Sequence, residues 1–309
     1  MNTRKTLLAA ALVPALGTLI FLGSTGCNSS NSDAAESAAS TETEAPQHDA
    51  DGMSVTSRTG TLKKIFHAAP SPVEMAKLIH RSGATFDAAA CNPTGANARY
   101  NTSDRQAINL GVYGADLSYS TIFEENAASL EYLSAIKNLS AQLGISDVIT
   151  DEVLQDAEAN RGDRQALINI VSDTFYDLNE RLKSNGTEDL AGLLVAAGWV
   201  EGMYLATQHL DQSPTELKAR IAEQKMTLDD VMRLCRSYEA TPELTALLTR
   251  METIEAAYAG VSLTESEGNV TQEDENTFVL GGGDEYTADD ATVAAIASAV
   301  AEVRTFCIQ

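Results

Sequence analysis

Apolar residues recur every three or four positions over most of this chain, a spacing that places them on one face of an α-helix. Near the C-terminus, for example, Val293, Ile296 and Val300 follow this spacing within an alanine-rich segment. Such a face needs a partner to cover it, so the pattern predicts helices that pack on one another. The expected helices span residues 71–82, 103–123, 125–143, 147–159, 163–184, 187–210, 214–224, 228–238, 242–259 and 288–306.

Sequence signals for helix starts support several of these boundaries. The segments 71–74 (Ser-Pro-Val-Glu) and 213–216 (Ser-Pro-Thr-Glu) combine a capping hydroxyl, a proline in the first turn and a glutamate three residues after the cap. Thr227, followed by Asp230, repeats the order of hydroxyl and carboxylate. This repeat predicts that one helix ends near residue 224 and that another begins at residue 228.

Strand signals are confined to two short pieces, residues 260–263 and 277–280, which are predicted to pair as a hairpin around an acidic loop. Residues 262–290 hold nine acidic and no basic residues. The segment 262–287 lacks the ligand order of a calcium loop, so we expect a solvated acidic loop there. The predicted fold is all-α, a multi-helix bundle of nine or ten helices with one short β-hairpin near the C-terminus.

The N-terminus has the three parts of a secretory signal. Arg4 and Lys5 precede an apolar run over residues 7–22, and three small residues, 24–26, lead directly to Cys27. This order resembles the lipobox of bacterial lipoproteins, in which the cysteine is lipidated and becomes the mature N-terminus. The resemblance implies a signal peptide over residues 1–26, lipidation at Cys27 and attachment to a membrane through the lipid.

A retained transmembrane helix is the alternative for the apolar run. Its sixteen residues, interrupted by Pro14 and Gly17, fall short of the roughly 20 that span a bilayer, so a removed signal is favoured. Asn28 follows the cysteine, where lipoproteins kept at the inner membrane often carry aspartate. The resemblance therefore implies an exported protein that is lipid-anchored to the bacterial envelope, at the outer membrane.

Residues 28–60 are rich in Ser, Ala, Thr, Asp and Glu and almost free of large apolar side chains. Residues 27–60 are therefore predicted to form a flexible acidic tether, with the helical domain following over residues 61–309. Loss of residues 1–26 leaves 19 basic against 44 acidic residues, a net charge of −25. This charge repels phosphate backbones and anionic head groups, which argues against nucleic acid as a partner and against electrostatic docking on a membrane.

Three cysteines remain besides Cys27, namely Cys91, Cys235 and Cys307. An odd number in an exported protein is compatible with one disulfide and one free thiol, or with three buried thiols that act as small apolar side chains. Their wide spacing does not fit a zinc site. Phosphate-binding glycine loops and common nucleophile motifs are also missing from the sequence, so we predict neither a metal nor a cofactor.

The most unusual helical segment begins at Asn109 and contains two glycines, each of which weakens a helix by roughly 1 kcal/mol relative to alanine. Asn109, Tyr113 and Asp116 lie at positions i, i+4 and i+7, and Ser120 continues the series. This spacing places an amide, a phenol, a carboxyl and a hydroxyl along one face of the predicted helix.

A similar segment, residues 197–209, carries two glycines four positions apart and a second polar stripe, formed by Glu201, Tyr204 and Gln208. Glycine inside a helix indicates the close approach of another backbone. We therefore expect the two segments to contact each other. The expected contacts join Gly111 or Gly114 to Gly198 or Gly202.

Two interpretations of this shared polar region follow. It is either a ligand site or a polar network inside the core, and the second is favoured because buried polar groups normally find partners for structural reasons. The candidate ligand-binding residues are Asn109, Tyr113, Asp116, Glu201 and Tyr204.

The phrases Asn-Leu-Gly-Val-Tyr-Gly-Ala-Asp-Leu (109–117) and Gly-Trp-Val-Glu-Gly-Met-Tyr (198–204) are similar to those of a family of uncharacterised bacterial lipoproteins. The similarity extends over residues 71–209. It implies an all-helical lipoprotein, and it carries over no catalytic residue because we know of no activity for that family.

Two functions are compatible with these sequence features. The first is a lipid-anchored envelope protein whose helical module binds a solute or an envelope partner without catalysis, which suits a long tether and a chain without reaction motifs. The alternative is an envelope glycan hydrolase that uses Asp116 and Glu201 as its acid and base. That chemistry requires the two carboxyl groups to lie about 5 to 10 Å apart across an open cleft.

Overall fold

The computed structural model describes residues 72–211, 214–264, 269–274, 277–281 and 285–309. All of these residues belong to one compact unit of the chain. The predicted signal peptide, the predicted tether and Cys27 lie outside the described residues.

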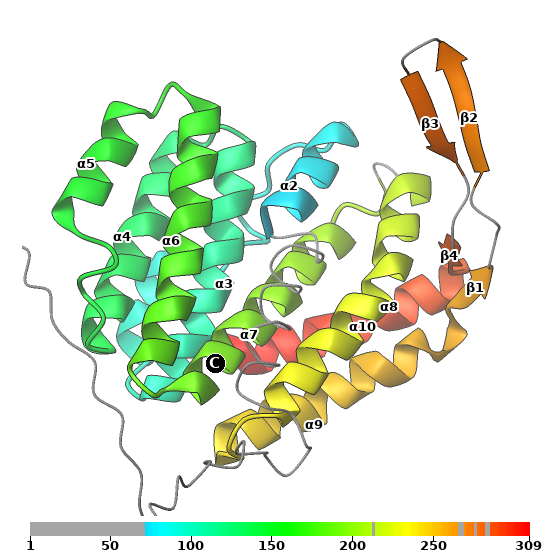
Figure 1. The fold of residues 1–309 in the computed structure, drawn as a ribbon. Coiled ribbons are helices and arrows are strands. Elements are labelled where there is room, and N and C mark those ends of the chain that lie inside the picture. Colours follow the sequence, from blue (N-terminus) through cyan, green and yellow to red (C-terminus); the bar gives the residue numbers. More distant parts are fainter. Residues whose placement is uncertain (1–71, 212–213, 265–268, 275–276, 282–284) are drawn as a thin grey trace, which may run out of the picture. The chain divides into compact units, whose positions relative to one another are not determined.

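The described residues form nine α-helices, two 3-10 helices and four short strands, so the predicted all-α fold with a short hairpin near the C-terminus is confirmed (Figure 1). The helices are α2 (Pro72–Arg81), η1 (Thr94–Arg99), α3 (Ser103–Ile122), α4 (Asn126–Gln142), α5 (Asp151–Ala159), α6 (Arg164–Ser184), α7 (Glu188–Thr207), α8 (Pro214–Arg236), α9 (Pro242–Ala257), η2 (Tyr258–Gly260) and α10 (Asp290–Cys307).

Helices α3 and α7 form the core of the described domain. Every residue of α3 from Gln106 to Ile122 is buried, and α7 is buried from Leu190 to Met203. Helices α2, α4 and α6 pack on α3, while α8, α9 and α10 pack on α7, and α3 and α7 pack on each other (Figure 1). The two segments with paired glycines therefore lie in the two most buried helices.

By length and composition alone, α7 is the one described helix that could cross a membrane. Its apolar window is 94% buried within the domain. Burial on this scale is typical of the central helix of a packed core, because a helix that is apolar all round needs cover on every side.

Helix α8 is continuous, so the predicted break between residues 224 and 228 is wrong. Leu217, Ile221, Leu228 and Val231 are all buried and continue one apolar face through the predicted boundary. Thr227 itself is buried, with 7% of its surface exposed. The hydroxyl-carboxylate signal is local, and the uninterrupted apolar face outweighs it because helix stability in proteins comes mainly from packing.

Helix α9 begins at residue 242, the predicted start of this helix. The Thr241 hydroxyl accepts a hydrogen bond from the backbone N–H of Leu244 at 3.2 Å, and Pro242 occupies the first turn. The cap satisfies one of the free N–H groups at the start of the helix, and proline is tolerated there because its missing N–H has no partner to lose.

The four strands form two antiparallel pairs. Strand β1 (Ser262–Thr264) pairs with β4 (Glu285–Thr287), and β2 (Asn269–Asp274) pairs with β3 (Thr277–Gly281). The predicted pairing of residues 260–263 with 277–280 is therefore wrong, and segment 262–287 is not a loop throughout. Pairing β2 with β3 closes a shorter loop at a lower cost in chain entropy.

Candidate functional site

The two glycine segments meet, as predicted, at a close crossing of α3 and α7. A Cβ atom built on Gly111 would lie 2.8 Å from the backbone nitrogen of Gly198 and would clash with the carbonyl of Leu194. A Cβ on Gly198 would lie 3.2 Å from the carbonyl oxygen of Gly111. The absence of side chains at these two positions lets the backbones approach closely.

The other two glycines do not take part in this crossing. Gly114 faces α6, where a Cβ atom would overlap the ring of Phe175. At Gly202 an added Cβ would meet no described atom within 4 Å. Of the glycines named as alternatives, Gly111 and Gly198 therefore make the predicted contact, whereas Gly114 and Gly202 point away from the crossing.

Asp116 of α3 and Glu201 of α7 lie together beside this crossing. Both are fully buried, with 0% exposure, and their carboxyl groups interact with each other. Burial, reinforced by the negative charge of Glu201, raises the pKa of Asp116 well above the usual carboxyl range. Burial also raises the pKa of Glu201, and the neighbouring Arg304 offsets part of that rise.

Arg304 of α10 supplies the positive charge of the site. Its Nε atom lies 3.0 Å from Glu201 Oε2 and its Nη2 atom lies 3.1 Å from Glu201 Oε1, a two-pronged ion pair. Nη2 also donates to the carbonyl oxygen of Ala90 at 2.9 Å. The guanidinium carbon lies 4.2 Å from the ring centroid of Tyr204, within the range of a cation–π contact.

The segment between α2 and η1 closes the site from a third direction. The backbone N–H of Asn92 donates to Asp116 Oδ2 at 3.1 Å. The carbonyl oxygen of Asn92 accepts from the Tyr132 hydroxyl of α4 at 3.1 Å. Cys91 contacts the Asp116 carboxyl, and burial next to these two carboxyl groups raises the pKa of its thiol.

Asn109 and Tyr113 also serve internal contacts. Asn109 accepts a hydrogen bond from the side-chain amide of Asn92 at 3.2 Å, and it donates to the carbonyl oxygen of Cys307 at 3.0 Å. The Tyr113 hydroxyl donates to the carbonyl oxygen of Pro93 at 3.1 Å. These bonds fix the 90–100 segment and the end of α10 against α3.

The predicted stripes therefore come together, but as a packed polar network rather than an open site. Glu201 and Asp116 touch and are sealed from solvent, whereas a glycosidase needs its two carboxyl groups on either side of a sugar. This geometry contradicts the assignment of the pair as the acid and base of a glycan hydrolase. It supports the alternative interpretation of a polar network inside the core.

Several partners in this network were not identified from the sequence, namely Asn92, Tyr100, Tyr132 and Arg304. Arg304 is 103 positions from Glu201, and no periodic pattern relates such distant residues. One signal was available, because Arg304 is the only basic residue of α10 and lies between the buried apolar residues Val303 and Phe306. A lone charge on a buried helix face indicates a buried partner.

The three described cysteines are free and buried, so the alternative of one disulfide is wrong. Burial raises the pKa of Cys235 and of Cys307 to about 12, which keeps both thiols protonated. Among the described residues, no group of three or more His, Cys, Asp or Glu side chains has an arrangement that could hold a metal ion.

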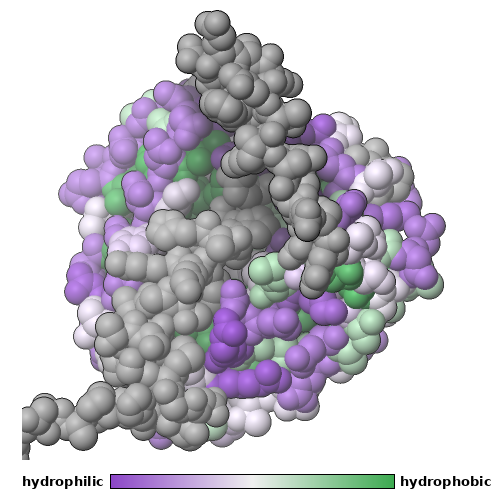
Figure 2. Space-filling view, turned by 45° about the vertical axis from the view of Figure 1, so that its right-hand side comes forward, coloured by the Kyte–Doolittle hydropathy of each residue, from purple (hydrophilic) through white to green (hydrophobic). Residues whose placement is uncertain are grey.

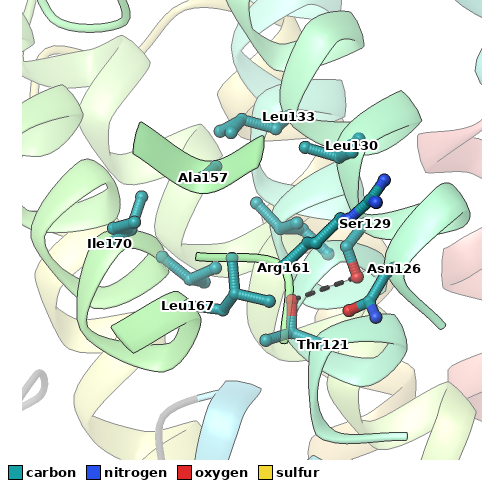
Figure 3. A pocket seen from close by; sticks show the side chains of 11 residues that line it. Thr121, Asn126, Ser129, Leu130, Leu133, Ala157, Arg161, Leu167 and Ile170 are labelled. Atoms are coloured by element: carbon teal, nitrogen blue, oxygen red, sulfur yellow. Dashed lines mark hydrogen bonds between the residues drawn. The ribbon is translucent and has the colours of Figure 1, made fainter. Parts of the chain in front are cut away.

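A small pocket lies between helices α3, α4, α5 and α6, away from the carboxyl pair (Figure 3). Figure 3 shows Arg161 across it, with Leu167 and Ile170 on one side and Thr121 and Ser129 on the other. The Thr121 hydroxyl donates to Ser129 at 3.3 Å. The cavity volume of about 10 Å³ is close to the least that holds one water, so a metabolite does not fit this pocket as it stands.

Hydrophilic residues dominate the described surface in the view of Figure 2, with apolar residues in smaller areas between them. The large exposed apolar side chains among the described residues are Tyr176, Met226 and Leu263, on α6, α8 and β1. Single exposed apolar residues of this kind are ordinary on protein surfaces.

Comparisons of the chain with known protein families, curated proteins and solved structures found no significant match.

Proposed function

We propose that this chain is a lipid-anchored protein of the bacterial cell envelope, placed at the outer membrane, and that its helical domain binds a solute or an envelope partner without catalysis. The secretory signal that ends at Cys27 and the acidic tether support the anchor. The non-catalytic role is supported by the burial of Asp116 and Glu201 and by their direct contact. Burial keeps this pair, the best candidate for an acid and a base, away from solvent and substrate.

The negative charge of the mature chain favours a cationic solute or a basic protein as the partner. With 19 basic against 44 acidic residues, the protein attracts cationic solutes and basic protein surfaces, and it repels anionic lipids and phosphate polymers. The tether gives the domain reach from the membrane, since a flexible chain of about 30 residues spans roughly 30 Å on average.

Mass spectrometry of the protein purified from the membrane fraction tests the anchor. We expect a mature N-terminal peptide that begins at Cys27 and carries the added mass of its acyl chains. Cys27→Ser is the matched control, and it should leave the chain unprocessed. A wild-type peptide that begins elsewhere, or an unmodified Cys27, would contradict the proposed anchor.

Native mass spectrometry of the purified mature protein tests the binding role, since a bound solute or protein adds its mass to the chain. A parallel assay follows the release of reducing ends from envelope glycan. We expect a bound partner and no release above buffer. Glycan cleavage that disappears in Asp116→Asn would contradict the non-catalytic role.

A further inference from the structure

We propose that Asp116 and Glu201 share one proton at neutral pH, and that this proton locks α3 to α7 in a contact that loosens in alkali. The inference is independent of the proposed function, because it concerns how the domain holds together rather than what it binds.

The geometry calls for a proton at this contact. Asp116 Oδ1 is buried and has no hydrogen-bond partner. Asp116 Oδ2 is already occupied by the backbone N–H of Asn92 at 3.1 Å. Two ionised carboxylates can only accept hydrogen bonds, so the contact between them needs one proton to become a bond. A buried acceptor without a partner is unfavourable, and a proton on the pair satisfies it.

The surroundings decide which carboxyl carries the proton. Arg304 contacts both oxygens of Glu201, at 3.0 and 3.1 Å, and so favours the ionised form of that residue. Asp116 receives the neutral backbone N–H of Asn92 and contacts the neutral thiol of Cys91, and both stabilise an anion less than a guanidinium does. Asp116 is therefore the protonated member, and it donates to Glu201.

The charge balance of the site agrees with this assignment. One ionised glutamate, one arginine and one neutral aspartic acid sum to zero, whereas a second ionisation leaves an uncompensated negative charge in the core. The remaining titratable groups around the pair are neutral and come from four places in the fold. They are Cys91 between α2 and η1, Tyr132 of α4, Tyr113 and Tyr119 of α3, and Cys307 of α10.

Loss of the proton would act on three parts of the fold at once. Repulsion between Asp116 and Glu201 would oppose the packing of α3 on α7. It would also disturb Asn92, whose N–H donates to Asp116, and Ala90, whose carbonyl oxygen accepts from Arg304. The protonated carboxyl pair therefore connects both central helices with the 90–92 segment and with α10.

The direction of the pH effect follows from proton linkage. Burial and the charge of Glu201 raise the pKa of Asp116 in the folded state, whereas the unfolded chain has an ordinary carboxyl. At a pH between the pKa of Asp116 in the unfolded chain and its pKa in the folded state, the folded state binds one more proton than the unfolded state. Stability from this group is thus complete below about pH 4, declines as the pH rises, and is lost above the folded pKa.

Urea unfolding of the full mature protein in detergent, from about pH 5 to about pH 9, measures this linkage. Asp116→Asn is the informative variant, because asparagine mimics the neutral acid and keeps a donor toward Glu201. Asp173→Asn, on the exposed face of α6, is the matched control. Over the linked pH range, the unfolding constant of the wild type and the control should rise about tenfold per pH unit relative to Asp116→Asn.

Infrared spectroscopy in heavy water gives a second reading that needs no variant. The folded wild type should show the C=O stretching band of a protonated carboxyl at neutral pH, and the band should vanish on unfolding. The proposal is overturned if this band is missing at neutral pH, or if a folded Asp116→Asn has the same pH profile as the wild type.

Discussion

At Gly111 the backbones of α3 and α7 lie so close that no side chain fits between them. An added Cβ would lie 2.8 Å from Gly198 N and would meet the carbonyl of Leu194, which is backbone and cannot rotate away. Gly202, in the same helix as Gly198, has no described atom within 4 Å of such a Cβ. Glycines four positions apart in α7 thus have different roles.

Gly111→Ala and Gly202→Ala form a matched test of this difference. We expect Gly111→Ala to force the helices apart and to lower the free energy of unfolding by about 1 to 3 kcal/mol. Gly202→Ala should be neutral or should gain up to about 1 kcal/mol from better helix propensity. Chemical denaturation measures both, and equal losses at the two sites would contradict the crossing described above.

The buried thiols give a second prediction at the residue scale. Cys91, Cys235 and Cys307 are free and buried, and burial raises the pKa of each thiol. Because the thiolate is the reactive form, a maleimide reagent at about pH 7 should leave the folded protein unlabelled and should label all three thiols after denaturation. Rapid labelling of the native protein at any of the three would show that the core opens there.

At the scale of elements, α10 fastens the two central helices to the 90–100 segment. Arg304 pairs with Glu201 of α7 and with the carbonyl of Ala90, while Asn109 of α3 donates to the carbonyl of Cys307 at the end of α10. These bonds join parts of the chain that are far apart in sequence. Whether these bonds form therefore depends on the tertiary structure.

Arg304→Met should be strongly destabilising, because Glu201 would remain as a buried charge without a partner. Removal of one member of a buried ion pair typically costs about 3 to 5 kcal/mol. Adding Glu201→Gln should recover much of this loss, since the remaining group is then uncharged. A double-mutant cycle measures the coupling, and additive losses in the double variant would contradict the ion pair.

Helices α8 and α9 allow a comparison of one substitution in two contexts. Thr241 caps α9 through the N–H of Leu244, whereas Thr227 lies inside the continuous helix α8. Thr241→Ala should lower the free energy of unfolding by about 1 kcal/mol, the usual loss of a cap. Thr227→Ala should change the free energy of unfolding by less than about 0.5 kcal/mol. A loss as large as that of Thr241→Ala would show that Thr227 caps a helix that begins at residue 228.

At the scale of the whole molecule, the sequence predicts the elements better than their tertiary contacts. Apolar spacing and caps are local, so most helices of the described residues agree with their predicted ranges within a few positions. The same local signals fail at Thr227, because the buried apolar face on both sides of this residue keeps α8 continuous. They also fail for the strands, because pairing depends on loop closure as well as on composition.

The candidate site was predictable only in part. Glycines in the interiors of two helices indicated their crossing, and the polar stripes indicated that Asp116 and Glu201 would face each other. The residues that convert this region from a pocket into a core network come from distant segments. Arg304 and Asn92 make bonds across 103 and 24 positions, which no local spacing encodes.

The central claim is that the carboxyl pair belongs to a sealed core and is not a site that opens to ligands. Native-state hydrogen exchange on the mature protein tests it most directly, through the Asn92 amide that donates to Asp116 and the amides of residues 109–120 and 197–206. We predict that these amides exchange only when the whole domain unfolds, with the free energy of global unfolding. Exchange of the Asn92 amide through a much easier local opening, together with protection upon adding a solute, would contradict the claim.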